Sequence, residues 1–177
     1  VERVVEVLGR RAARLGRTKL VLIDGPSGAG KTVFAGRLAP AVGAEVVHTD
    51  DLLDGWGDQF TYWDRLERLV LQPIRSGSEA RYQKYDWVEK EFAEWVTVEA
   101  GDVLIVEGVG AARARGRVMA SVTVFVDAPE AVRLARSMAR DGLAMQEELS
   151  EWRRREALHF AADGTAWCAD VVIGSSS

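Results

Sequence analysis

The chain has 177 residues, of which 47% are hydrophobic and 28% are charged, a mixture typical of one soluble globular domain. Its 23 Lys and Arg against 27 Asp and Glu give a net charge of −4, so no basic field favours a nucleic acid polymer as partner. One cysteine and two histidines exclude an internal disulfide and a multi-cysteine or imidazole-rich metal site. No apolar run reaches the ~18 residues of a membrane span, so we expect a cytoplasmic protein without a membrane partner.

Apolar residues at helical spacing from Val4 to Leu15 predict an amphipathic helix that ends near Gly16. Five short apolar runs further along the chain are typical of buried parallel strands, and helical patterns separate them. The predicted strands are 19–24, 45–49, 103–107, 122–127 and 170–173, and the predicted helices are 31–42, 62–75, 130–140 and 147–161. This alternation predicts an α/β sandwich, a five-stranded parallel sheet with helices on both faces.

The sequence contains no linker, so we predict a single domain over residues 1–177. The least regular part lies between the second and third predicted strands, where such folds place their substrate loops. We therefore expect an acceptor-binding segment at about 51–98 and a small lid at about 133–160.

A glycine-rich motif follows the first predicted strand. Residues 25–32 (GPSGAGKT) match G-x-x-x-x-G-K-[ST] at every fixed position, between a strand and a helix as the phosphate-binding loop requires. Glycines let the amides turn inward around a β-phosphate, Lys31 neutralises the β- and γ-oxygens, and the Thr32 hydroxyl is a ligand for Mg²⁺. The alternative is a glycine-rich turn that binds nothing. The expected nucleotide-binding residues are Gly25, Ser27, Gly28, Ala29, Gly30, Lys31, Thr32 and Val33.

Other features narrow the class of phosphate-loop protein. The chain contains no asparagine, so the N-K-x-D motif that reads guanine is impossible. The third strand ends in Val106-Glu107-Gly108, without an Asp-Glu pair, and the chain is short for a large AAA-type ATPase. A small phosphotransferase fits these features better.

Two acids follow predicted strands and therefore lie at the carboxyl edge of the sheet, beside the phosphate loop. Asp50 can accept the proton of an attacking hydroxyl and help to orient Mg²⁺; the alternative is a helix N-cap. Glu107 can face the same metal directly or through water; the alternative is an ordinary strand-end acid. The metal ligands expected are thus Thr32, Asp50 and Glu107.

Arginines recur on one face of the helix predicted after the fourth strand. Arg133, Arg136 and Arg140 lie at i, i+3 and i+7, so they can close over the phosphates and stabilise the charge on the transferring group. The alternative is a solvated basic face paired with Glu130 and Asp141. We expect Arg136 and Arg140 to act in catalysis with Lys31 and Asp50.

Several residues of the irregular segment are candidates for binding the acceptor. Trp56, in a Gly-Trp-Gly loop, is the preferred pocket aromatic, whereas Trp63 and Trp95 are expected to pack in the core. Asp58 and Asp86 can bind acceptor hydroxyls or hold turns. Beyond Glu107, Arg113 can meet an anionic acceptor.

The order and spacing of these motifs resemble the uridine kinase and phosphoribulokinase branch of the P-loop kinases over most of the chain. The residues that carry the resemblance are the phosphate loop, Thr49-Asp50, Tyr85-Asp86-Trp87, Val106-Glu107-Gly108, the 133–141 helix and Ala169–Ile173. The resemblance implies that Asp50 is the catalytic base, that Thr32 and Glu107 attend Mg²⁺, that Arg136 and Arg140 belong to the lid, and that Tyr85 contacts the acceptor. Lys90 stands where nucleoside kinases of this family carry a histidine that reads the base. This difference from the family pattern does not favour uridine as the acceptor.

These features predict a kinase that uses ATP and Mg²⁺ and transfers the γ-phosphate to a hydroxyl of a nucleoside or sugar-like small molecule. Two alternatives stay open: a nucleoside monophosphate kinase and a regulatory module that binds nucleotide and hydrolyses it slowly or not at all. The first alternative depends on phosphate-binding arginines at Arg65, Arg68, Arg75 and Arg81. The sequence leaves open both a monomer and a homo-oligomer.

Overall fold

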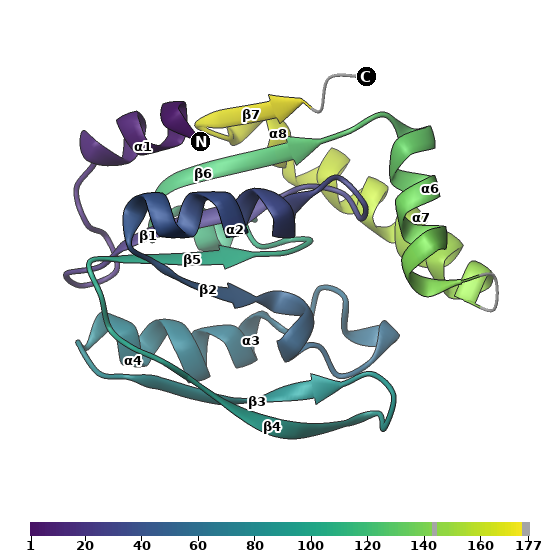
Figure 1. Cartoon of the computed structure of the whole chain (residues 1–177), viewed down its shortest axis with the longest axis horizontal. Coiled ribbons are helices and arrows are strands. Elements are labelled where there is room, and N and C mark those ends of the chain that lie inside the picture. Colours follow the sequence, from purple (N-terminus) through teal and green to yellow (C-terminus); the bar gives the residue numbers. More distant parts are fainter. Residues whose placement is uncertain (143–144, 175–177) are drawn as a thin grey trace.

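Five parallel strands form the central sheet, in the order β2-β5-β1-β6-β7 (Figure 1). Their bounds are β1 Lys19–Asp24, β2 Glu45–His48, β5 Val103–Glu107, β6 Ala120–Asp127 and β7 Val171–Gly174. The computed structural model describes residues 1–142 and 145–174, so residues 143 and 144 of the predicted lid and residues 175–177 lie outside the described residues. The predicted five-stranded parallel sheet is confirmed.

The sheet is covered on both faces, as the nearly continuous apolar strands require. Side chains alternate along β1, so Leu20 and Leu22 enter one core and Val21 and Ile23 enter the other. The second core is closed by α1 (Glu2–Gly9) and α2 (Lys31–Val42). The first core is closed by a helical segment made of α3 (Trp63–Leu66), a π-helical turn at Glu67–Leu71 and α4 (Gln72–Arg75).

The N-terminal helix is shorter than its apolar pattern predicts. It ends at Gly9, and Leu15 reaches the core instead through a tight turn in which Leu15 and Thr18 exchange backbone hydrogen bonds. The exposed Arg10 and Arg11 separate these two elements. Leu15 therefore falls at helical spacing by chance, because it belongs to a turn and not to the helix.

An antiparallel hairpin, β3 (Ala80–Asp86) and β4 (Glu91–Val98), occupies part of the segment that the sequence left irregular. Ala80, Tyr82 and Val98 bury one face of the hairpin against the α3–α4 core. The hairpin lies beyond β2, away from the central sheet (Figure 1). Trp95, expected in the core, is 59% exposed on the open side of the hairpin, so that expectation is wrong.

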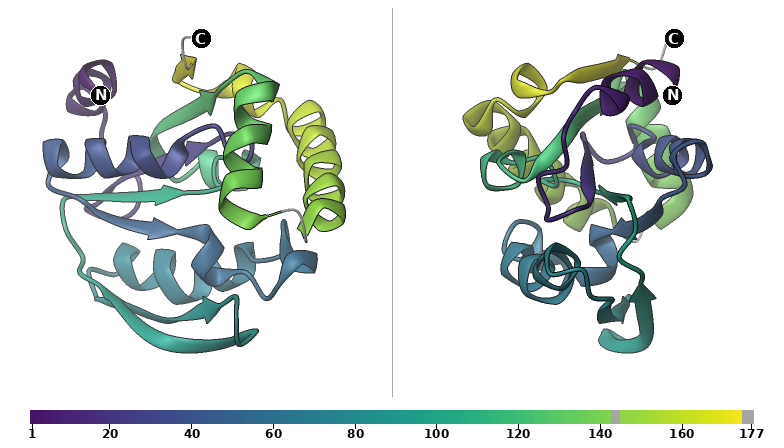
Figure 2. Two further views of the ribbon diagram at one scale, coloured as in Figure 1. Left: turned by 45° about the vertical axis from the view of Figure 1, so that its right-hand side comes forward. Right: turned by 90° about the vertical axis from the view of Figure 1, so that its left-hand side faces the viewer.

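Two long helices, α6 (Glu130–Asp141) and α7 (Gln146–Asp163), lie side by side beyond the carboxyl ends of the strands (Figure 2). Short helices α5 (Ala114–Arg117) and α8 (Thr165–Cys168) complete the chain. Within the described ranges, no helix is both long enough and apolar enough to cross a membrane. The candidate site lies at the carboxyl ends of the parallel strands, next to α6 and α7.

Candidate functional site

The phosphate loop joins β1 to α2 in the conformation that its glycines predict. Gly28 and Gly30 have φ of 78° and 103°, in the left-handed region that residues with a Cβ rarely adopt. A Cβ at Gly28 would also lie 2.5 Å from the carbonyl oxygen of Arg133. The helix begins at Lys31, so the amides of its first turn have no partner within the helix and can bind an anion. The Lys31 ammonium donates to the Pro26 carbonyl at 3.1 Å.

A buried carboxylate holds the start of this loop. Asp24 accepts hydrogen bonds from the amides of Gly25 at 2.7 Å and of Gly110 and Ala112 at 2.8 Å each. Burial raises the pKa of Asp24 to about 6, against the lowering effect of these amides and of Lys31. Asp24 thus fastens the phosphate loop to the loop that follows β5.

Thr32, Glu107 and His48 form one hydrogen-bonded group beside the loop. The Thr32 hydroxyl donates to Glu107 Oε1 at 2.9 Å, and His48 Nδ1 lies 2.6 Å from the same oxygen. Burial acts to raise the pKa of Glu107, but the His48 hydrogen bond and the charge of Lys31 outweigh it, and the pKa lies below its ordinary value. The hydrogen bond to Glu107 in turn raises the pKa of His48. Glu107 is therefore an ionised carboxylate.

Asp50 lies in a 3-10 turn (Thr49–Leu52) directly after β2. Its carboxylate is open to a cavity, and no hydrogen bond reaches that carboxylate from the described residues, so the N-cap alternative has no support. Partial desolvation by the surrounding protein raises the pKa of Asp50, although the positive charge of Lys31 opposes this shift and the residue remains exposed to solvent. Its backbone carbonyl accepts a hydrogen bond from Trp87 Nε1 at 3.3 Å.

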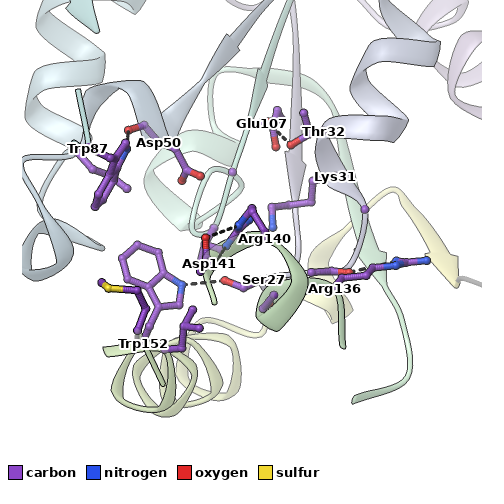
Figure 3. Close-up of a pocket in the computed structure, with 18 of the residues that line it drawn as sticks. Ser27, Lys31, Thr32, Asp50, Trp87, Glu107, Arg136, Arg140, Asp141 and Trp152 are labelled. Atoms are coloured by element: carbon purple, nitrogen blue, oxygen red, sulfur yellow. Dashed lines mark hydrogen bonds and ion pairs between the residues drawn. The ribbon is translucent and has the colours of Figure 1, made fainter. Parts of the chain in front are cut away.

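One cavity of about 640 Å³ brings these groups together (Figure 3). At one end lie the phosphate loop, Thr32 and Glu107, and at the other lie Asp50 and Trp87. Trp152 connects the two ends, because it contacts Ser27 of the loop and the ring of Trp56. The cavity is also lined by Asp51, Leu53, Trp56, Arg136, Arg140, Asp141, Met145 and Leu149. The distribution separates a cationic end, suited to polyphosphate, from an aromatic and acidic end.

The two lid arginines reach the cavity from α6. Arg136 donates from Nη1 to the Gly28 carbonyl at 3.1 Å, so it contacts the outside of the phosphate loop. Arg140 makes two hydrogen bonds to the Asp141 carboxylate, at 2.8 and 2.7 Å. Both arginines line the cavity, and their role in catalysis stays a prediction.

Of the expected acceptor residues, Trp56 lines the cavity. It does not stand alone in its loop: its ring packs edge-on against Trp87 and Trp152, each with ring centroids 5.5 Å apart. Tyr85 lies behind this aromatic wall, 5% exposed, with its ring against Trp87. Tyr85 is not among the residues that line the cavity but supports Trp87, and its contact with the acceptor stays a prediction.

The charged acceptor candidates are also outside the cavity wall. Asp58 pairs with Arg65 at 2.7 Å, and Asp86 accepts the amides of Val88 and Glu89 in the hairpin turn. Arg113 donates to the carbonyls of Gly110 and Phe60 and packs over neighbouring aromatic rings. These side chains hold turns and loops through local partners, although Nη2 of Arg113 is buried without a hydrogen-bond partner among the described residues. Gly25 and Ala29 likewise shape the phosphate loop without lining the cavity.

Sequence reasoning missed the contribution of α7. Trp152 lines the cavity and donates from Nε1 to Ser27 Oγ at 2.8 Å, and Glu156 accepts from the same serine. Both lie in a helix rich in charged residues, where an acid is usually a solvated partner of arginine. No local pattern marks a contact between residues 125 or more positions apart.

The donor set at the loop suits Mg²⁺. This ion takes one or two carboxylates together with phosphate oxygens and water, and Thr32 and Glu107 present a hydroxyl and an ionised carboxylate at one point. Among the described residues there is no group of three or more His, Cys, Asp or Glu side chains arranged to hold a metal. The site therefore fits an ion bound in part through the nucleotide, and it does not fit an all-protein cage.

The parallel sheet and the glycine-rich loop between β1 and α2 define a P-loop protein. A family model described as an AAA domain matches residues 21–158, and the chain belongs to this family. The match names a domain family, so the argument from the sequence against a large AAA-type ATPase stays a prediction. The match covers the phosphate loop, both strand-end acids and most of the lid.

Three solved structures that superpose on this chain are described as kinases. A possible uridine kinase from Bacillus stearothermophilus superposes with a TM-score of 0.68 at 18% identity, covering 97% of this chain and 99% of that chain. A proposed fructose transport system kinase from Silicibacter sp. TM1040 gives 0.67 at 22% identity, covering 96% and 94%. A sugar kinase from Janibacter sp. HTCC2649 gives 0.53 at 18% identity, covering 89% and 84%. The fold expected from the resemblance is thus confirmed. No curated protein matches the chain in sequence.

Proposed function

We propose that the protein is a small-molecule kinase that uses ATP and Mg²⁺ and phosphorylates a hydroxyl of an uncharged, nucleoside- or sugar-like acceptor. The observation that carries this proposal is the single cavity that joins the phosphate loop to the free carboxylate of Asp50. A phosphoryl donor at one end and a proton acceptor at the other are the two requirements of phosphoryl transfer to an alcohol.

The residues have separate roles in this reaction. The loop amides and Lys31 hold the triphosphate, and Thr32 and Glu107, with Asp50, hold the Mg²⁺, which neutralises charge on the phosphate oxygens when bound. The acceptor oxygen forms a bond to the γ-phosphorus while the bond between that phosphorus and the β–γ bridging oxygen breaks, and ADP leaves. Asp50 takes the hydroxyl proton. Its raised pKa, caused first by desolvation, makes the carboxylate a better proton acceptor than an ordinary aspartate.

Arg136 and Arg140 would stabilise the negative charge on the transferring group. For this role, Arg140 must exchange its present partner, Asp141, for phosphate oxygens. Because both residues belong to α6, a rotation of the Arg140 side chain away from Asp141 would bring this about, and a movement of α6 toward the loop would shorten its reach to the phosphates.

The charge distribution favours an uncharged acceptor over a nucleoside monophosphate. The acceptor end presents Asp50, Asp51 and three tryptophans, an acidic and aromatic surface that repels a phosphate group. The arginines that the monophosphate alternative requires do not line the cavity in the described part of the chain; Arg65 is paired with Asp58 and Arg81 covers Trp95. The tryptophans suit the flat apolar face of a sugar or base.

A radiolabel assay tests the proposal. Purified protein with Mg²⁺ and ATP labelled at the γ-phosphate is incubated with a panel of nucleosides, sugars, amino sugars and nucleoside monophosphates. Transfer of label to a neutral hydroxyl compound supports the proposal. Transfer only to monophosphates, or only to water, would instead favour a monophosphate kinase or a slow nucleotide-hydrolysing module.

A further inference from the structure

Glu156, near the middle of α7, is an acid in an unusual place. It is 2% exposed, and its partner is Ser27 in the phosphate loop. Glu156 Oε2 accepts from the Ser27 hydroxyl at 2.9 Å, and its two oxygens lie 3.2 and 3.1 Å from the Ser27 amide nitrogen, which donates to them. A helix far along the chain thereby holds the loop by both the backbone and the side chain of one residue.

The cost of burying this carboxylate is only partly offset by positive charge. Burial raises the pKa of Glu156, while Lys31 and Arg133 act in the opposite direction, and Arg133 Nη1 stands 3.9 Å from Glu156 Oε1. A buried acid without a close ion pair is costly, so its hydrogen bonds to Ser27 have to compensate. A buried carboxylate of this kind is expected where its hydrogen bonds fix the conformation of a neighbouring segment, here the phosphate loop.

Trp152 lies one helical turn before Glu156 and binds the same hydroxyl. Its Nε1 donates to Ser27 Oγ at 2.8 Å, so this hydroxyl accepts from Trp152 and donates to Glu156. The Trp152 ring packs edge-on against Trp56 in the aromatic wall, and the Trp152 carbonyl accepts from Gln59 Nε2 at 3.0 Å. One face of α7 therefore contacts both the phosphate loop and the wall at the acceptor end.

Ser27 immediately precedes Gly28 to Thr32, whose amides are expected to bind the phosphates. Gly28 and Gly30 can adopt many backbone conformations, because glycine has no Cβ. The loop therefore needs contacts from other segments to stay in one arrangement. Fixing the amide and hydroxyl of Ser27 restrains the loop at the point where it turns toward the cavity. Preorganised amides bind phosphate more tightly, because no free energy is spent on ordering them when the ligand arrives.

We propose that Glu156 is a positioning residue of the phosphate loop: through Ser27, and together with Trp152, it holds the loop amides in the arrangement that binds the nucleotide triphosphate. The inference rests on the proposed function in one respect, namely that the loop binds a nucleotide. Glu156 itself acts through Ser27 and does not need to touch the nucleotide.

The test is calorimetric binding of a non-hydrolysable ATP analogue with Mg²⁺, which needs no knowledge of the acceptor. Glu156→Ala removes the acceptor of the charge-assisted hydrogen bonds and is expected to weaken binding by ~10- to 100-fold, the range for one such bond. Glu156→Gln keeps a carbonyl oxygen for the Ser27 amide and should recover part of this loss. The matched control is Glu151→Ala, an exposed acid of the same helix whose partners are Arg154 and Arg155; it should bind within ~2-fold of the wild type.

Thermal unfolding of the same variants separates positioning from mere stability. A lower melting temperature with unchanged analogue affinity in Glu156→Ala would overturn the proposal. If that variant does not fold, Glu156→Gln and Trp152→Phe decide the question; the latter deletes one donor to Ser27 and keeps the ring, and both should weaken binding. Wild-type affinity in both would also overturn it. Absence of binding by the wild type would instead refute nucleotide binding itself.

Discussion

The Thr32 hydroxyl donates a hydrogen bond to Glu107 Oε1 at 2.9 Å, although the two residues are 75 positions apart in the chain. This contact joins the first turn of α2 to the carboxyl end of β5, so it sets the distance between the phosphate loop and the strand-end acid. Because His48 holds the same carboxylate oxygen, Glu107 is fixed from two sides and kept ionised. Under the proposed function, this pair would hold a divalent cation that arrives with a nucleotide.

We expect Glu107→Gln to raise the Mg²⁺ concentration for half-maximal activity by ~10-fold or more, the usual cost of a lost ligand or of its partner. The amide keeps the size of the side chain but removes its charge. A Mg²⁺ titration of the initial rate at saturating ATP measures the effect. An unchanged Mg²⁺ dependence would remove Glu107 from the metal site.

Lys31→Ala should weaken ATP binding by ~100-fold or more without unfolding the domain. The lysine is 9% exposed and lines the cavity, so it supplies a poorly solvated charge next to the phosphates, and its loss is large for the triphosphate. Calorimetry with the ATP analogue measures the affinity, and circular dichroism checks the fold. Equal affinity in the variant and the wild type would contradict the phosphate-loop assignment.

Trp87→Ala should raise the acceptor KM by about tenfold and change the ATP KM by less than ~3-fold, because the ring lies at the acceptor end and donates to the Asp50 carbonyl. The matched control is Trp95→Ala on the same hairpin, where the ring is 59% exposed on the open side. Steady-state kinetics with the best acceptor of the panel provide both constants. Similar effects of the two substitutions would show that the hairpin as a whole matters, and not the ring of Trp87.

Asp24 should make stability fall as pH rises between about 4 and 6. Its pKa is raised from 3.8 to about 6 by burial, so over this range the folded state keeps a proton that the unfolded state has lost. The stabilisation is full below the unfolded pKa and is lost as pH rises through the folded pKa, by on the order of 3 kcal/mol. Urea unfolding of the wild type and of Asp24→Asn at several pH values isolates this contribution. The free energy of unfolding of the wild type minus that of Asp24→Asn should decrease as pH rises. A value that stays constant or increases would contradict the prediction.

The sequence predicted the parts of the site that depend on local pattern. Strand-end acids and a phosphate loop lie at one sheet edge whenever the strands are parallel, so Thr32, Asp50 and Glu107 could be brought together before any coordinates. The five apolar runs predicted the sheet for the same reason. The hairpin escaped because its alternation is interrupted: the register shifts between Gln83 and Tyr85.

Contacts between distant segments could not be predicted in this way. Asp58 and Arg113 have the chemistry of acceptor-binding residues, yet an ion pair and backbone carbonyls engage them elsewhere. The reverse holds for Glu156: its sequence neighbours are typical of a solvated helix, yet its hydrogen-bond partner is Ser27 in the phosphate loop. The residue type indicates which chemistry a side chain can perform, but tertiary packing decides which side chains line the cavity.

The most direct measurement of the central claim pairs turnover with nucleotide affinity in Asp50→Asn. The substitution keeps the shape of the side chain and removes its ability to accept a proton, so turnover should fall by at least ~10², while the affinity for the ATP analogue stays within a few fold. Full turnover in this variant would contradict the role of Asp50 as the base, and a large loss of nucleotide affinity would show that it belongs to the phosphate site.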